Sequence, residues 1–116
     1  MVSADKTLSW SYTEEFLTED EPTAQARMRG MELGISPVSP GTGAALRVLA
    51  ASVGAKSVAE IGTGTGVSGL WLLGGMGGDG VLTTIDIEPE LQLEARRAFD
   101  AAGYASSSSK DRKSVV

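Results

Sequence analysis

Residues 58–68 read Val58-Ala59-Glu60-Ile61-Gly62-Thr63-Gly64-Thr65-Gly66-Val67-Ser68, and the next apolar run, residues 81–85, ends at Asp86. Alternate glycines after an apolar run predict a sharp turn from a buried strand into a helix, because glycine tolerates positive φ and has no Cβ. A carboxylate about 20 residues farther on completes an arrangement that holds an adenosine-containing cofactor. The stretch therefore predicts an α/β fold with a cofactor site at the glycine turn.

Two classes of cofactor use this device, and Glu60 separates them. In a dinucleotide site the pyrophosphate lies over the helix N-terminus, and a Gly-x-Gly-x-x-Gly spacing follows the strand directly. The frame that begins at Gly64 has this spacing, but it starts two residues after the strand runs into Gly62. The Glu60 carboxylate would repel a pyrophosphate and attract the ammonium and sulfonium of S-adenosylmethionine. We therefore predict that the cofactor is S-adenosylmethionine. The alternative is that the chain is half of an NAD-dependent oxidoreductase.

Three ordered motifs resemble the cation-dependent O-methyltransferase family that is related to catechol and caffeoyl-CoA methyltransferases, and within it the actinobacterial, mycobacterial-type members. They are residues 38–46, the glycine stretch 58–68, and residues 83–90, Thr83-Thr84-Ile85-Asp86-Ile87-Glu88-Pro89-Glu90. The resemblance covers residues 22–104 and implies the N-terminal, cofactor-binding half of a Rossmann-like class I methyltransferase fold. In the complete enzyme it implies methyl transfer from S-adenosylmethionine to a hydroxyl of a small-molecule acceptor.

The resemblance assigns four residues to the methionine end of the cofactor. Glu60 is expected to accept the ammonium. Ser68, at the positive end of the following helix, is expected to bond the carboxylate. Val38 and Ser39 match a segment that touches the same end of the cofactor. An alternative for Ser68 is that its hydroxyl satisfies its own helix backbone.

The resemblance gives roles along the cofactor to four further residues. Gly62 and Gly64 would let the backbone pass under the cofactor, Asp86 would accept both ribose hydroxyls, and Ile87 would pack on the adenine. An alternative for Asp86 is a cap on the next helix, although Pro89 already marks the start of that helix.

Catalytic and metal-binding residues cannot be assigned. The family's second half, which the resemblance expects to hold a divalent cation and to orient the acceptor, has no counterpart in this chain. The chain has neither histidine nor cysteine, and none of the acidic residues after Asp86 matches the family's metal motif. A magnesium-type site needs several converging oxygen ligands. We therefore expect a divalent cation only in a full-length member.

Composition limits the classes of binding partner and the cellular location that we expect for this chain. A net charge of −5 and a pI near 4.6 argue against nucleic acid or an anionic membrane surface as partners. No run of about 18 apolar residues and no secretory leader occur. The absence of cysteine fits the cytoplasm. Two expected strands do not make a stable sheet, so we expect a homodimer or a higher association, and we keep a non-catalytic binding fragment as an alternative function.

The chain divides into a helical segment (1–33), a cofactor-binding half-domain (34–104) and a flexible polar tail (105–116). Residues 1–9 are expected to fray, and Met28 and Met31 to fill the core. Periodicity and turn signals predict helices over residues 22–33, 40–53, 67–73 and 89–102, and strands over residues 57–61 and 81–86.

Overall fold

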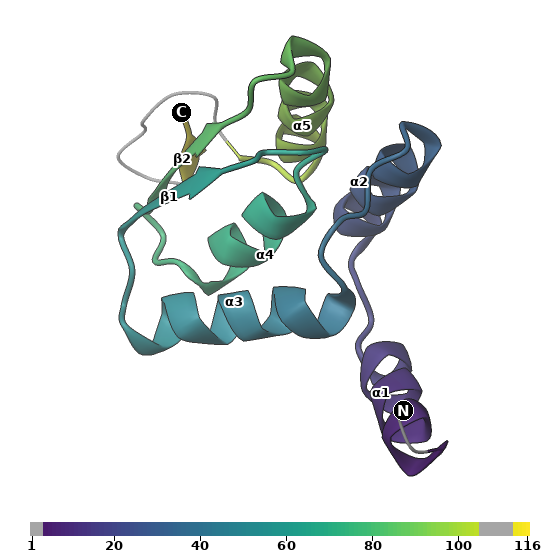
Figure 1. Cartoon of the computed structure of the whole chain (residues 1–116). Helices are drawn as coiled ribbons and strands as arrows, with labels where there is room; N and C mark the ends of the chain where they lie inside the picture. Colours follow the sequence, from purple (N-terminus) through teal and green to yellow (C-terminus); the bar gives the residue numbers. More distant parts are fainter. Residues whose placement is uncertain (1–3, 105–112) are drawn as a thin grey trace.

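A computed structural model describes residues 4–104 and 113–116, in which helices and strands alternate from β1 to β3. This order is typical of an α/β fold with a parallel sheet (Figure 1). The elements are, in chain order, α1 (Ala4–Phe16), α2 (Glu21–Glu32), α3 (Pro40–Ser52), β1 (Ser57–Ile61), α4 (Val67–Gly75), β2 (Val81–Ile85), α5 (Pro89–Ala101) and β3 (Ser114–Val115).

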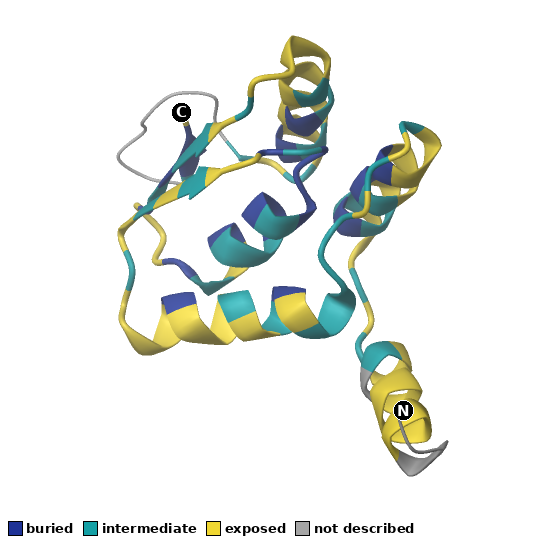
Figure 2. Cartoon of the chain, viewed as in Figure 1, coloured by how far each residue is buried: buried dark blue, intermediate teal, exposed yellow. Residues whose placement is uncertain are grey.

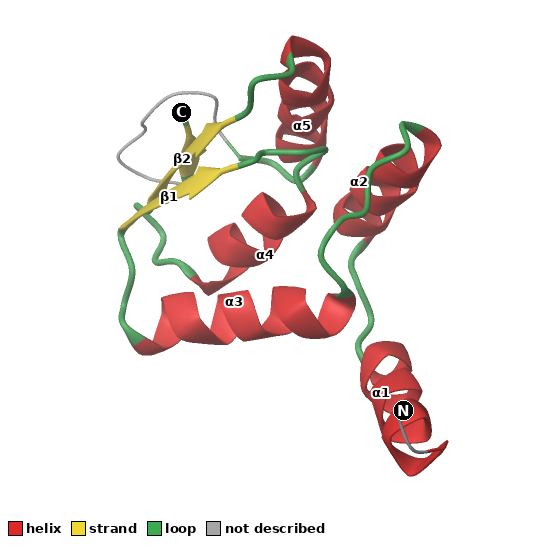
Figure 3. Cartoon of the chain, viewed as in Figure 1, coloured by secondary structure: helices red, strands yellow, loops and turns green. Residues whose placement is uncertain are grey.

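The strands form one parallel sheet in the order β1-β2-β3 (Figure 3). β1 pairs with β2 from Ser57 opposite Val81 to Ile61 opposite Ile85. Because the carboxyl ends of parallel strands meet at one edge of the sheet, this register brings the glycine turn after β1 beside Asp86 after β2. The predicted α/β class is confirmed, and it places both halves of the candidate site at this edge.

The hydrophobic core lies between the sheet and helices α4 and α5 (Figure 2). Leu73 of α4 and Leu82 of β2 are fully buried, and Phe99 of α5 packs into the same cluster. Helix α4 is apolar nearly all round because it lies between α3 and the sheet. Its first residue, Val67, is also buried, which fixes the start of the helix beneath the glycine turn.

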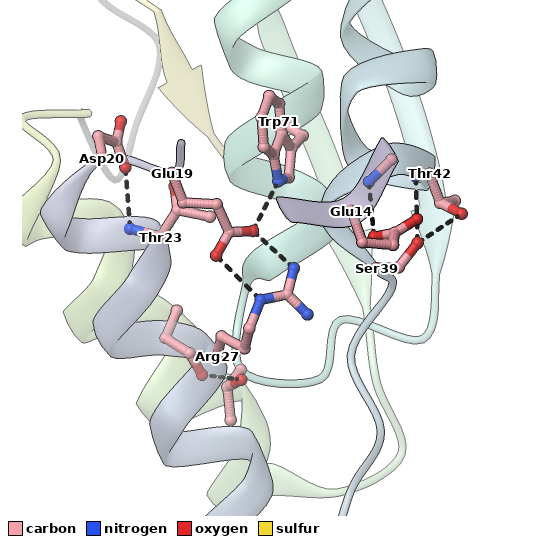
Figure 4. A network of polar contacts seen from close by, with 11 residues as sticks. Glu14, Glu19, Asp20, Thr23, Arg27, Ser39, Thr42 and Trp71 are labelled. Carbon is pink, nitrogen blue, oxygen red and sulfur yellow. Dashed lines mark hydrogen bonds and ion pairs between the residues drawn. The ribbon is translucent and has the colours of Figure 1, made fainter. Parts of the chain in front are cut away.

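Polar side chains fix helix α2 against this core. Asp20 caps α2, since its Oδ1 accepts the Thr23 N–H at 3.0 Å. The Glu19 carboxylate accepts two bonds from the Arg27 guanidinium, at 2.6 and 2.9 Å, and one from Trp71 Nε1 at 3.3 Å (Figure 4). These contacts tie α2 to α4, and therefore hold it beside the carboxyl edge of the sheet.

The expectation of a flexible polar tail is wrong at the end of the chain. Residues 105–112 lie outside the described part, but Ser114 and Val115 form β3 and are buried. Val116 donates its N–H to Leu82 O at 2.8 Å. The reason is that the edge of β2 presents unpaired backbone groups to any extended segment that reaches it. The predicted division of the chain at residues 33 and 104 stays a prediction.

Two expectations for the N-terminal helices also differ from the structure. Residues 4–9 belong to α1 rather than to a frayed end. Met28 and Met31 are 56% and 67% exposed, so they do not fill the core. The buried face of α2 consists instead of small residues, Thr23, Ala26 and Gly30, which allow α2 to approach its neighbours closely.

One face of the sheet stays open in the described part of the chain. Along β1 the side chains of Ser57, Ala59 and Ile61 are exposed, whereas Val58 and Glu60 are half-buried. No described strand pairs with the outer edge of β1. Parallel sheets are normally covered on both faces. The half-sheet therefore presents a face and an edge that suit a further layer of structure.

Candidate cofactor site

The glycines of the turn have backbone conformations that other residues rarely adopt. The φ angle is +93° at Gly62, +57° at Gly64 and +99° at Gly66. A Cβ added to Gly62 would meet no atom within 4 Å, and one added to Gly64 would lie 3.5 Å from Ile35 Cδ1. The need for glycine at these two positions is therefore conformational, and the turn has open space beside it.

This turn forms one wall of a cavity of about 280 Å³. Val38, Gly62, Gly64, Ser68 and Asp86, five of the predicted site residues, line it. The other lining residues are Ile35, Ser36, Pro37, Thr63, Thr65, Val67 and Leu91. Sites for cofactors usually enclose at least about 300 Å³, so the volume suits a site that this part of the fold encloses incompletely.

Glu60 lies next to Ser68 at the end of β1. Its Oε2 accepts the Ser68 hydroxyl at 2.8 Å, and its Oε1 accepts the Thr84 hydroxyl at 2.9 Å. Burial raises the pKa of the Glu60 carboxyl above its usual value, and the two hydroxyl bonds oppose that rise. A partly dehydrated carboxylate without a cationic partner is costly. This environment therefore favours a ligand that brings a positive charge.

Ser68 does not cap its own helix. The N-cap of α4 is Gly66, which makes no side-chain cap, and the single hydroxyl proton of Ser68 goes to Glu60. The alternative in which Ser68 satisfies its own helix backbone therefore differs from this structure. To donate to a ligand carboxylate, Ser68 would have to release Glu60.

Asp86 connects the two halves of the site. Its Oδ2 accepts the Gly64 N–H and its Oδ1 the Glu88 N–H, both at 2.9 Å. Bonds from the amides of Glu88 and Gly64 lower the pKa of Asp86 below its usual value. The N-cap of α5 is Glu88, so Asp86 shapes the turn before that helix and also holds the glycine turn. Ile87, next to it, is 92% exposed.

The segment before α3 contributes less directly. Ser39 caps α3, since its Oγ accepts the Thr42 N–H at 3.3 Å and lies 3.2 Å from Thr42 Oγ1 (Figure 4). Val38 lines the cavity, but Ser39 does not. Of the predicted residues, Ser39, Glu60 and Ile87 thus lie outside the cavity wall, and Glu60 is linked to it through Ser68.

Sequence reasoning missed three threonines. Thr84 bonds Glu60, Thr63 bonds Thr84, and the buried Thr65 donates to Ala26 O at 2.7 Å, which anchors the turn to α2. One signal was available for Thr84: aligning the ends of the two parallel strands places it opposite Glu60. The Thr65 bond spans 39 positions and had no local signal.

Neither a metal site nor a membrane segment is found in the described residues. Across residues 4–104 and 113–116, no cluster of three or more acidic side chains gathers to hold an ion. Within the same residues, no helix combines the length and the apolar character that crossing a membrane requires.

Comparison with known proteins identifies the family. The sequence profile of a family described as O-methyltransferase matches residues 8–111. This chain belongs to the O-methyltransferase family. A relative from Mycobacteroides abscessus that carries an O-methyltransferase name is 55% identical over 97 residues, which are 84% of this chain and 45% of the relative. An O-methyltransferase relative from Mycobacterium tuberculosis is 54% identical over 98 residues, 84% of this chain and 44% of its own.

Solved structures of O-methyltransferases and their relatives share the fold. A protein from Corynebacterium glutamicum has a TM-score of 0.78 at 32% identity, over 98% of this chain and 52% of its own. An O-methyltransferase from Streptomyces achromogenes, solved with S-adenosylmethionine, has a TM-score of 0.77 at 26% identity. The match covers 99% of this chain and 52% of the Streptomyces protein. The predicted family and the class I methyltransferase fold are confirmed. The O-methyltransferase chain described here spans about half the length of these proteins.

Proposed function

We propose that this chain is the S-adenosylmethionine-binding half of an O-methyltransferase that methylates a hydroxyl of a small-molecule acceptor. One observation carries the proposal: the half-buried Glu60 carboxylate, which has no cationic partner among the described residues, is bonded to Ser68 in the wall of a cavity that Asp86 also lines. Glu60 lies near the carboxyl end of β1 and Asp86 directly follows the parallel neighbour β2, which suits an adenosine-containing ligand with an ammonium group.

The residues present fit this cofactor. Glu60 would bind the ammonium at the oxygen that Ser68 now occupies, and the released Ser68 hydroxyl would be free to donate to the carboxylate of the ligand. Asp86 has lone pairs beyond the two that its amide bonds use, and these would accept the ribose hydroxyls. Ile87 offers an exposed apolar surface to the adenine. When bound, the cofactor supplies an electrophilic methyl group.

This assignment favours S-adenosylmethionine over a dinucleotide. A pyrophosphate at the glycine turn would approach the Glu60 carboxylate, and like charges within a few ångströms repel strongly where water is partly excluded. The neighbour solved with S-adenosylmethionine supports the same choice. The alternative of an NAD-dependent oxidoreductase half has the glycine spacing that begins at Gly64 in its favour, but the Glu60 carboxylate opposes it.

The half of the relatives that this chain does not span would complete the site. Its expected contributions are the acceptor pocket and a divalent cation that activates the acceptor hydroxyl. The open face and edge of β1 are suited to covering by that half or by a second copy of the chain, so we also propose homodimer or higher association. We also propose that the protein is located in the cytoplasm and that its acceptor is a small molecule.

A second candidate function follows from the coverage of the relatives. A chain that spans 45% of a relative is suited to bind the cofactor without catalysing transfer, and to act by association. Adding the C-terminal half of the Mycobacteroides relative as a separate chain and assaying methyl transfer to a catechol would distinguish the two. Restored transfer supports the enzyme, whereas stable binding of the two chains with cofactor bound but no transfer favours the binding fragment.

Isothermal titration of the whole chain tests the cofactor. S-adenosylhomocysteine, which retains the ammonium, should bind more tightly than NAD⁺. Glu60→Gln should reduce that preference, while the matched change Glu90→Gln, on the exposed first turn of α5, should not. Equal or tighter binding of NAD⁺ by the unaltered chain would contradict the assignment.

A further inference from the structure

Two threonine hydroxyls form a chain that ends on the Glu60 carboxylate. Thr84 Oγ1 donates to Glu60 Oε1 at 2.9 Å, and Thr63 Oγ1 lies 2.8 Å from Thr84 Oγ1. A hydroxyl has one proton to donate. Because the Thr84 proton goes to Glu60, Thr63 must donate to Thr84. Both hydroxyls therefore direct their protons toward the carboxylate.

We propose that Thr84 is a positioning residue that holds Glu60 in the orientation that receives the ammonium of the cofactor, and that Thr63 holds Thr84 in turn. The inference rests on the proposed function, because it requires an ammonium at Glu60. Glu60 and Thr84 are direct partners in the β1–β2 register, and Thr63 is 3% exposed. Both threonines are β-branched, so each has few side-chain rotamers.

The two oxygens of Glu60 have different surroundings. Ser68, on Oε2, lines the 280 Å³ cavity, whereas Thr84, on Oε1, does not. Thr84 instead lines a smaller neighbouring cavity of about 130 Å³, and Thr63 lines both cavities. A ligand that enters the larger cavity meets the Ser68 bond first. Ser68 is therefore the exchangeable partner of Glu60, and Thr84 is the partner that stays.

A purely structural role for Thr84 makes a different prediction. If Thr84 only satisfied a buried carboxylate, its loss would loosen the site for every ligand of the cavity. A positioning role affects only ligands that place a cation on Glu60, since a misdirected carboxylate loses a charge-assisted bond and leaves the other contacts intact. Ligands with and without the ammonium therefore separate the two roles.

The test compares two ligands by isothermal titration of the full chain. S-adenosylhomocysteine carries the ammonium, and 5′-methylthioadenosine shares its adenosine and sulfur but lacks the amino-acid group. Thr84→Val, which keeps the shape and removes the hydroxyl, should weaken the first roughly threefold to tenfold and the second less than about twofold. Thr84→Ser should restore most of the affinity. Thr83→Val, on the opposite face of the same strand, is the matched control.

A double-mutant cycle with Glu60→Gln completes the test. Once the charge is gone, Thr84→Val should add little further loss for S-adenosylhomocysteine, so the two effects should not add. Equal weakening of both ligands by Thr84→Val, or of neither, overturns the positioning role. If Glu60→Gln weakens S-adenosylhomocysteine and Thr84→Val does not, only this inference fails. If Glu60→Gln changes nothing, the proposed ammonium site fails with it.

Discussion

Replacing Asp86 with alanine tests the adenosine end of the site. In the unliganded chain the change removes the carboxylate that accepts the Gly64 and Glu88 amides, each at 2.9 Å. Both amides lie where water can replace the lost acceptor, because these bonds are part-buried or exposed. We therefore expect the chain to stay folded and the glycine turn to become less ordered.

The loss of affinity can be worked from the lone pairs of Asp86. A carboxylate has about four acceptor positions, and two are used by the amides, so two remain for the ribose hydroxyls. A hydrogen bond to a charged group contributes roughly 1.5 to 3 kcal/mol, and partial exposure of Asp86 reduces this. Because this reduction brings the two bonds together to about 1.4 to 2.8 kcal/mol, we expect binding to weaken roughly tenfold to a hundredfold.

Titration calorimetry with S-adenosylhomocysteine measures this loss. Glu90→Ala is the control, because it removes a nearby carboxylate from the exposed first turn of α5. Glu94 is less suitable as a control. Its position on α5 suggests an exposed side chain, but Glu94 bonds Arg29 and Arg97 and its side chain is only 13% exposed. If Asp86→Ala binds as tightly as Glu90→Ala, Asp86 only shapes the turn and the ribose role is wrong.

Three further predictions concern pH, packing and association. Because the pKa of Asp86 is lowered, its contribution to binding should persist below pH 4 and be lost as the pH falls through that lowered value, which titrations at decreasing pH would detect. Gly75→Ala should destabilise the chain by about 1–3 kcal/mol in urea unfolding, because the new Cβ would collide with the backbone oxygen of Arg47. Gly74→Ala, whose Cβ would lie 3.6 Å from Arg47 Cδ, should be neutral or slightly stabilising; equal effects would contradict the packing argument. Light scattering at micromolar concentration should report at least twice the chain mass, since the β1 edge is open, and a monomer would refute this.

Local signals explain why much of the fold could be predicted. The strand over residues 57–61, the glycine turn and the helix that starts at Pro89 depend on neighbours within a few positions, and the structure has them where expected. The bond between Glu60 and Thr84 depends on strand register, which the residues near Glu60 do not encode. The strand β3 was not predicted for a related reason. Its neighbours in the sequence are polar, and the strand forms because it pairs with the edge of β2.

Glu60 also links stability to cofactor binding. Because its pKa is raised, the folded chain holds this proton to higher pH than the unfolded chain does, so stability falls as the pH rises from the usual glutamate value to the raised one. Glu60→Gln keeps acceptor and donor atoms for Thr84 and Ser68 without the charge. The unliganded variant should therefore melt at a higher temperature than the wild type near pH 7, with a smaller difference near pH 4, while binding S-adenosylhomocysteine less tightly. A variant that melts lower than the wild type near pH 7 but not near pH 4 would show that the charged carboxylate stabilises the free chain, and would contradict the reasoning.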